Sequence, residues 1–228
     1  MWLRTVLPAH HLDAETKDVV KLGVGLIGTM AALLLGLLVA SAKSTFDARR
    51  SELTQMAANT ILLDRTLAHY GPETAAIRGI LKVAVARIID QVWPQSGKEG
   101  GLTSQTGGEI IFDKIQELTP RSDAQRTIQS QAESMAINLG QTRWLLFEQA
   151  GTSISLPFLL VVVFWLSMLF VSFGLFAPSN ATAITTLLVS AISVAGAIFL
   201  ILELDHPFSG VIQISSAPLR SALAVLGR

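Results

Sequence analysis

The longest uncharged stretch of this chain runs from Gln149 to Leu202, and Ala177-Pro178-Ser179-Asn180 interrupts it near its middle. Each half is long enough to cross a bilayer, because roughly 20 apolar helical residues span the hydrocarbon core. Backbone polar groups inside lipid must be paired within the structure, and a helix pairs all of them along one segment. The stretch therefore predicts two transmembrane helices joined by a short turn, at 151–176 and 181–202.

A third apolar stretch lies near the N-terminus, where no charged residue occurs from Leu22 to Ala42. The alternative is a buried helix of a soluble domain, but this length without charge favours a membrane span, which we place at 19–42. Residues 1–18 carry charges where a secretory signal peptide would have its apolar core, so we expect no cleaved signal.

The polar region between the first two spans, residues 43–150, has the spacing of amphipathic helices. One apolar stripe comprises Leu53, Met56, Thr60, Leu63 and Leu67, at intervals of three and four. The first span can therefore run directly into this helix, because no helix-ending residue intervenes.

Gly71-Pro72 is expected to end that helix, with Pro72 in the first turn of the next one. The second helix carries the stripe Ile77, Leu81, Ala84, Ile88 and Val92. Residues 95–108 are rich in Gly, Ser and Thr and predict a surface loop. Two further helices are predicted, one at 109–118 and one from Pro120 through Leu146.

The predicted fold is an all-α integral membrane protein with three transmembrane helices and a helical bundle inserted between spans 1 and 2. Arginine and lysine are in excess beside the bundle, which places residues 43–150 in the cytoplasm by the positive-inside rule. The same rule places the C-terminal segment, 203–228, in the cytoplasm and residues 1–18 outside. Within that segment, Val211 to Leu226 is amphipathic and is expected either to dock on the bundle or to lie along the membrane surface. We therefore expect a multi-pass protein of a cytoplasmic membrane.

Composition argues against several functions. The formal net charge is zero, so no basic excess is present to neutralise nucleic-acid phosphates. The chain has no cysteine, which excludes disulfides, thiol catalysis and thiolate metal sites. His10-His11 with Asp13 and Glu15 match no metal-ligand spacing, and no phosphate loop or nucleophile motif occurs. We predict no enzyme, no metal and no cofactor.

The first span is rich in small residues, and these are the candidate pore-lining positions. Small residues let helices approach closely where lipid supplies no hydrophobic drive between them. One interpretation is a packing seam against the other two spans. The other is a helix that lines a conduit at the centre of an oligomer. The set, here called the small-residue face, comprises Gly25, Gly28, Thr29, Ala32, Gly36 and Ala40.

Three charged residues lie at the ends of the spans and are candidates for the mouth of a pore. Lys43 follows the first span, and Glu203 and Asp205 follow the third. Acids near the bilayer are costly and often functional, so the two carboxylates could form a ring at an entrance. The alternative is that both are solvated residues at the end of a span.

Three blocks of the chain resemble the bestrophin-like domain family of bacterial and plant membrane proteins. They are HHLDAETKDVVKLGVGLIGTMAALLLGLLVASAK at 10–43, ELTQMAANTILLDRTLAHYGPET at 52–74 and LELDHPFSGVIQISSAPLR at 202–220. The resemblance implies a relation to bestrophins, which are oligomeric ion channels, typically pentamers, with a pore lined by a span near the N-terminus. That role would fall to the small-residue face. Leu22 to Ala42 lacks the aromatic side chains of a bestrophin neck, and no acidic run resembles a calcium clasp.

Our leading hypothesis is a homo-oligomeric ion channel, with a pentamer as the first expectation, whose partners are the lipid bilayer and inorganic ions. The first spans would surround the pore, and ions would pass passively. A second hypothesis is a non-conducting membrane scaffold or sensor whose cytoplasmic helices recruit a partner. A transporter is a weaker third hypothesis, because the spans show no inverted repeat.

Overall fold

The computed structural model of the chain describes residues 14–93, 107–148, 156–178 and 180–228. Within these ranges all regular structure is helical and no strand occurs. The chain divides into two compact units. The span unit comprises residues 1–45 and 152–205, and the bundle unit comprises 46–151 and 206–228. The predicted loop at 95–108 falls almost entirely outside the described residues.

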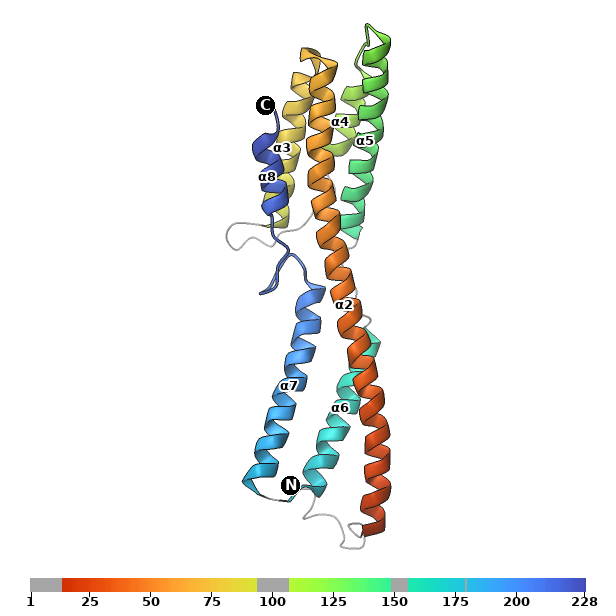
Figure 1. Cartoon of the computed structure of the whole chain (residues 1–228), viewed down its shortest axis with the longest axis vertical. Coiled ribbons are helices and arrows are strands. Elements are labelled where there is room, and N and C mark those ends of the chain that lie inside the picture. Colours follow the sequence, from red (N-terminus) through yellow and green to blue (C-terminus); the bar gives the residue numbers. More distant parts are fainter. Residues whose placement is uncertain (1–13, 94–106, 149–155, 179) are drawn as a thin grey trace. The chain divides into compact units, whose positions relative to one another are not determined.

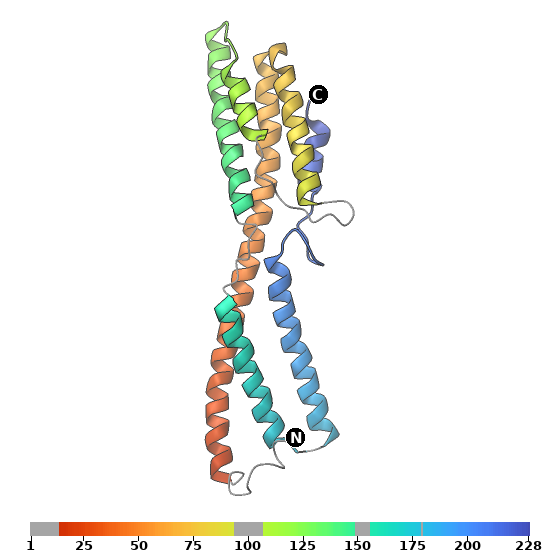
Figure 2. The ribbon, with the colours of Figure 1, turned by 180° about the vertical axis from the view of Figure 1, so that it is seen from behind.

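The span unit contains the three helices that are long and apolar enough to cross a membrane, as predicted. They are the first part of α2 (Ala14–Tyr70), α6 (Leu156–Phe176) and α7 (Ala181–Asp205), seen in Figures 1 and 2. α6 and α7 pack against each other. The side-chain oxygen of Asn180 accepts a 2.8 Å hydrogen bond from the Ala183 N–H, which caps the start of α7. α2 continues past residue 45 into the bundle unit without a break.

The bundle unit is built from the second part of α2, the short 3-10 helix η2 (Pro72–Thr74), α3 (Ala75–Val92), α4 (Gly107–Gln116), α5 (Asp123–Glu148) and α8 (Ala217–Val225). α3 lies beside α4 and α8, and α4 lies beside α5 (Figure 1). The predicted stripe on α2 is confirmed, because Leu53, Met56, Thr60, Leu63 and Leu67 are all buried. On α3 the fully buried residues are Ile77, Leu81, Val85 and Ile89. The last three members of the predicted stripe, Ala84, Ile88 and Val92, are half-buried, so they lie at the edge of the buried side.

The starting point of α5 was predicted wrongly. Pro120 lies outside the helix, which begins at Asp123. The hydroxyl of Ser122 accepts a 3.2 Å hydrogen bond from the Gln125 N–H, and the Gln125 side chain accepts one from the Arg121 N–H at 2.8 Å. This reciprocal arrangement resembles a capping box and satisfies donors that the first turn leaves open.

The segment after α7 docks on the bundle, which was one of the two expectations. Its helix, α8, is shorter than the amphipathic stretch suggested, and Pro218 lies in its first turn. The Trp93 indole N–H donates a 2.9 Å hydrogen bond to the Ile214 carbonyl, and the Trp93 ring meets Phe208 edge to face at 5.7 Å. Leu219 and Ala222 of α8 are fully buried.

Gly71 makes the sharp turn between α2 and α3. Its φ of 144° and ψ of 178° lie in a region that is essentially restricted to glycine. A Cβ at this position would also collide with the Glu73 carboxylate. The Thr74 hydroxyl completes the turn, because its one proton is shared between the carbonyls of Leu67 and Gly71.

We expect Gly71→Ala to lower the free energy of unfolding by about 1–3 kcal/mol, the usual cost of forcing a side chain into such a conformation. Gly79→Ala is the matched control, because Gly79 lies within α3 and a Cβ there meets nothing within 4 Å. It should raise stability by about 0.5–1 kcal/mol through helix propensity. Chemical denaturation followed by circular dichroism checks both signs, and equal effects of the two changes would contradict this account of the turn.

Candidate functional site

The membrane part of α2 presents one buried side and two exposed stripes. Ala31, Leu38 and Ala42 are buried within the chain. Their spacing of seven and four places them on one face of the helix. Large exposed side chains form a second stripe, comprising Leu22, Leu26, Met30, Leu33 and Leu37. The small-residue face lies between the buried side and this leucine-rich stripe.

The structure divides the small-residue face into two groups. Thr29, Ala32, Gly36 and Ala40 are exposed in the single chain, and we call them the outer small-residue stripe. Thr29, Ala32 and Gly36, with Leu33 and Leu37, border a shallow open depression on the surface of α2. A Cβ at Gly36 would meet nothing within 4 Å. These four positions therefore do not form a packing seam against α6 and α7 of the same chain.

Gly25 and Gly28 belong to a different environment. Both border a crevice between α2, α6 and α7 within the span unit. Gly28 is half-buried, and the first atom that a Cβ there would meet is Leu169 Cδ2 at 3.8 Å. The packing interpretation thus describes Gly28, while the outer stripe stays open for another partner.

The three candidate mouth residues also differ from one another. Lys43 is exposed, and Glu203 is half-buried. Asp205 is only 5% exposed, so the alternative that both acids are solvated is wrong for Asp205. A carboxylate buried in this way does not present its charge to an aqueous entrance. Of the two acids, Glu203 alone keeps access to water in the single chain.

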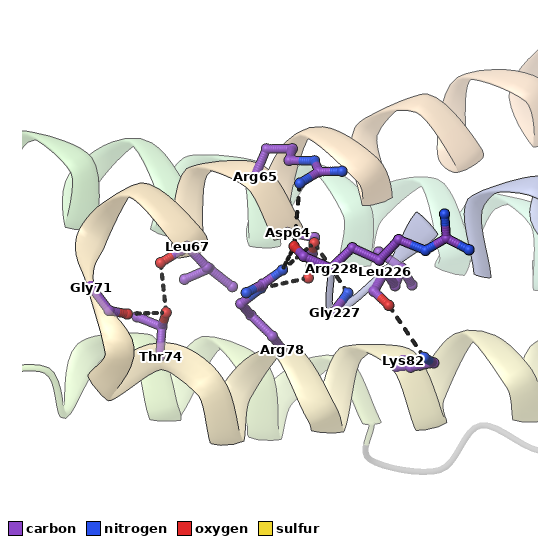
Figure 3. Close-up of polar contacts among 10 residues, drawn as sticks. All are labelled: Asp64, Arg65, Leu67, Gly71, Thr74, Arg78, Lys82, Leu226, Gly227 and Arg228. Atoms are coloured by element: carbon purple, nitrogen blue, oxygen red, sulfur yellow. Dashed lines mark hydrogen bonds and ion pairs between the residues drawn. The ribbon is translucent and has the colours of Figure 1, made fainter. Parts of the chain in front are cut away.

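The bundle unit holds a polar cluster that sequence reasoning missed. Arg78 of α3 binds Asp64 of α2 through two parallel hydrogen bonds, Nε to Oδ1 at 2.8 Å and Nη2 to Oδ2 at 2.9 Å (Figure 3). The Asp64 side chain is 1% exposed and that of Arg78 is 16% exposed. The hydrogen bonds to Asp64 raise the pKa of the Arg78 guanidinium, and burial opposes them.

The same cluster holds the end of α8 through main-chain groups (Figure 3). The Arg228 carbonyl accepts hydrogen bonds from Arg78 Nη2 at 2.8 Å and from Arg65 Nη1 at 3.3 Å. The Leu226 carbonyl accepts one from Lys82 Nζ at 3.2 Å, and the Gly227 N–H donates to Asp64 Oδ2 at 3.4 Å. Every partner is thus part of the protein itself, so the cluster serves to fasten α8 to α2 and α3.

Among the described residues, no group of three or more His, Asp or Glu side chains is arranged to hold a metal ion. His10, His11 and Asp13 lie outside the described residues, as does the side chain of Glu15. The features of the described residues that remain as candidates for function are therefore the uncharged faces of the spans, the charges at their ends and the polar cluster of the bundle unit.

Comparison with known proteins agrees with these features. The model of the bestrophin-like domain matches residues 1–219. A crystal structure of a bacterial bestrophin homologue from Klebsiella pneumoniae is similar with a TM-score of 0.68 at 15% identity, over 89% of this chain and 84% of that chain. A single-residue variant of that homologue gives 0.67 at 16% identity, over 89% and 85%. No curated protein matches.

The structural likeness supports the fold alone at these identities. The family match covers nearly the whole sequence, and the three membrane-spanning helices agree with it. This membrane protein belongs to the bestrophin-like domain family.

Proposed function

We propose that this protein is an oligomeric ion channel of the bacterial cytoplasmic membrane, with α2 innermost and five copies as the first expectation. Ions would cross passively along the outer small-residue stripe. The observation that carries the proposal is that Thr29, Ala32, Gly36 and Ala40 form a continuous uncharged stripe that none of the described helices of the same chain covers. Membership of a family related to bestrophin channels is its second support.

The stripe suits a conduit physically. Its side chains are hydrogens, methyl groups and one hydroxyl, so copies arranged around an axis would leave room between their backbones. The Thr29 hydroxyl donates to the Leu26 carbonyl at 2.8 Å, which leaves its oxygen able to accept hydrogen bonds from water in the lumen. A pore of this composition leaves ions largely hydrated, so it supplies little selectivity of its own.

Selectivity would then come from the charges at the ends of the spans. Lys43 favours anions at its mouth, and Glu203 favours cations. Of the three candidate mouth residues, Asp205 is buried, which leaves the exposed Lys43 and the half-buried Glu203. In the orientation given by the positive-inside rule, this mouth faces the cytoplasm.

Planar-bilayer recordings of the purified full chain test the proposal. We expect discrete currents that persist when ATP and ion gradients are absent, driven by voltage alone. Empty detergent-treated bilayers are the control. Silence across a range of salts and voltages, from protein shown to be folded and inserted, would favour the alternative of a non-conducting scaffold or sensor whose bundle unit recruits a partner.

A further inference from the structure

The crevice between α2, α6 and α7 has the size of a ligand site. Its volume is about 740 Å³. Pockets that hold small organic molecules span about 300–1,000 Å³. The α2 wall is built from Gly25 and Gly28, whose missing side chains create much of the space, since a Cβ at Gly25 would meet nothing within 4 Å. The crevice lies wholly within the span unit.

The opposite walls are mainly apolar. Phe173 and Phe176 of α6 and Leu187 of α7 face the space. The Thr186 hydroxyl also lines it but donates to the Thr182 carbonyl at 2.9 Å. An occupant here gains by hydrophobic contact along its length, which an acyl chain provides.

One rim of the crevice carries charge. Lys21 borders the crevice, and its Nζ lies 3.0 Å from Asp18 Oδ1, with both side chains about 70% exposed. The rim therefore offers one ammonium and one carboxylate side by side, with no net charge. A head group that contains both a phosphate and an ammonium complements this pair, whereas a purely anionic head group would meet the carboxylate as well.

The charged rim lies on the same side of the crevice as the end of α6 and the start of α7, and we call these two helices the α6–α7 hairpin. Lys21 lies about two turns after the start of α2 at Ala14, α6 ends at Phe176, and α7 begins at Ala181. Residues near all three of these places border the crevice. A lipid in the leaflet at this end would place its head group beside Lys21 and its tail toward Gly28 and Leu169. Long basic side chains at helix ends reach the head-group region in the same way.

We propose that this crevice binds one phosphatidylethanolamine-type lipid, with the phosphate on Lys21, the ammonium on Asp18 and one acyl chain between Gly25, Gly28 and the α6–α7 hairpin. Lipid bound there wedges α2 apart from the hairpin and supports the side of α2 opposite the leucine-rich stripe. The site is separate from the outer small-residue stripe and does not depend on conduction.

Photolabelling of the purified full chain tests this site. The probe is phosphatidylethanolamine with a diazirine on one acyl chain, in vesicles of phosphatidylcholine, and labelled peptides are located by mass spectrometry. We expect label within 169–187. Gly25→Leu fills the crevice and should reduce this label about tenfold, while Gly196→Leu, on an open part of α7, should leave it unchanged.

A second labelling experiment tests recognition of the lipid head group. The same diazirine on phosphatidylglycerol should label 169–187 about fivefold less, the most that an exposed ion pair supplies. Asp18→Asn should remove that preference, because the Asp18 carboxylate is the group that binds the ammonium and repels a purely anionic head group. Equal labelling in wild type and Gly25→Leu, or label spread evenly over all exposed spans, would overturn the proposal. Cross-links from this crevice to a second copy would also overturn it, because a neighbouring helix would then be the occupant. These results stand whether or not the protein conducts.

Discussion

Changing Arg78 to alanine is expected to lower the free energy of unfolding of the bundle unit by about 3–5 kcal/mol, the usual cost of removing one partner of a buried ion pair. The Asp64 carboxylate is 1% exposed and would lose both of its hydrogen bonds to Arg78. The Arg228 carbonyl would lose its shortest hydrogen bond at the same time.

Arg126→Ala is the matched control for this prediction. Arg126 also pairs with an aspartate, Asp123, at 3.2 Å, but both side chains are largely exposed. Exposed pairs of this kind contribute about 0–1 kcal/mol. Urea denaturation in detergent, followed by Trp93 fluorescence in a background where the other tryptophans are phenylalanine, measures both variants. Arg78→Ala and Arg126→Ala with similar midpoints would contradict the fastening role of the cluster.

Changing Gly36 to leucine is expected to reduce single-channel conductance by about tenfold or more. In an oligomer with α2 innermost, every copy would add a leucine side chain to the same level of the pore, and hydrophobic constrictions block ions by dewetting. Within one chain the new side chain enters open space, because a Cβ at Gly36 meets nothing within 4 Å. The fold of each copy should therefore survive.

Gly196→Leu controls for adding a leucine to a span. Gly196 is an exposed position of α7 with equally open surroundings. Planar-bilayer recording gives the conductance, and light scattering of the detergent complex gives the number of copies. A Gly36→Leu protein that changes its copy number but conducts normally would support a packing role and would contradict the pore assignment.

Local pattern was sufficient to predict the helices. The uncharged runs predicted three membrane-spanning helices, and the structure contains three helices of the required length and composition. The stripe from Leu53 to Leu67 predicted which side of α2 is buried, and Gly71-Pro72 predicted its end, because a special backbone conformation at glycine is a local property. The start of α5 was missed because Ser122 and Gln125 form a better boundary than Pro120.

The sequence alone could not predict that the small-residue face divides into two groups with different surroundings. Gly25, Gly28 and Gly36 have the same chemistry, and periodicity places them on neighbouring parts of one helix. Only the positions of α6 and α7 distinguish them, and these depend on contacts between segments far apart in the chain. The burial of Asp205 is another tertiary property of this kind.

The polar cluster did leave a signal in the sequence. Asp64 falls beside Leu63 and between Thr60 and Leu67, so a charged residue borders a stripe that is otherwise buried. Arg78 likewise follows Ile77 and precedes Leu81 on α3. A charge on the edge of each of two consecutive amphipathic helices, joined by a tight turn, predicts a pair between them.

Thiol modification during bilayer recording tests the pore most directly. The chain contains no cysteine, so Ala32→Cys provides a single thiol on the outer small-residue stripe, and Leu188→Cys provides one at an exposed position of α7. We predict that a charged, water-soluble thiol reagent reduces the current through the Ala32→Cys protein and leaves the Leu188→Cys protein unchanged. Block at Leu188→Cys with no effect at Ala32→Cys would contradict a pore lined by α2.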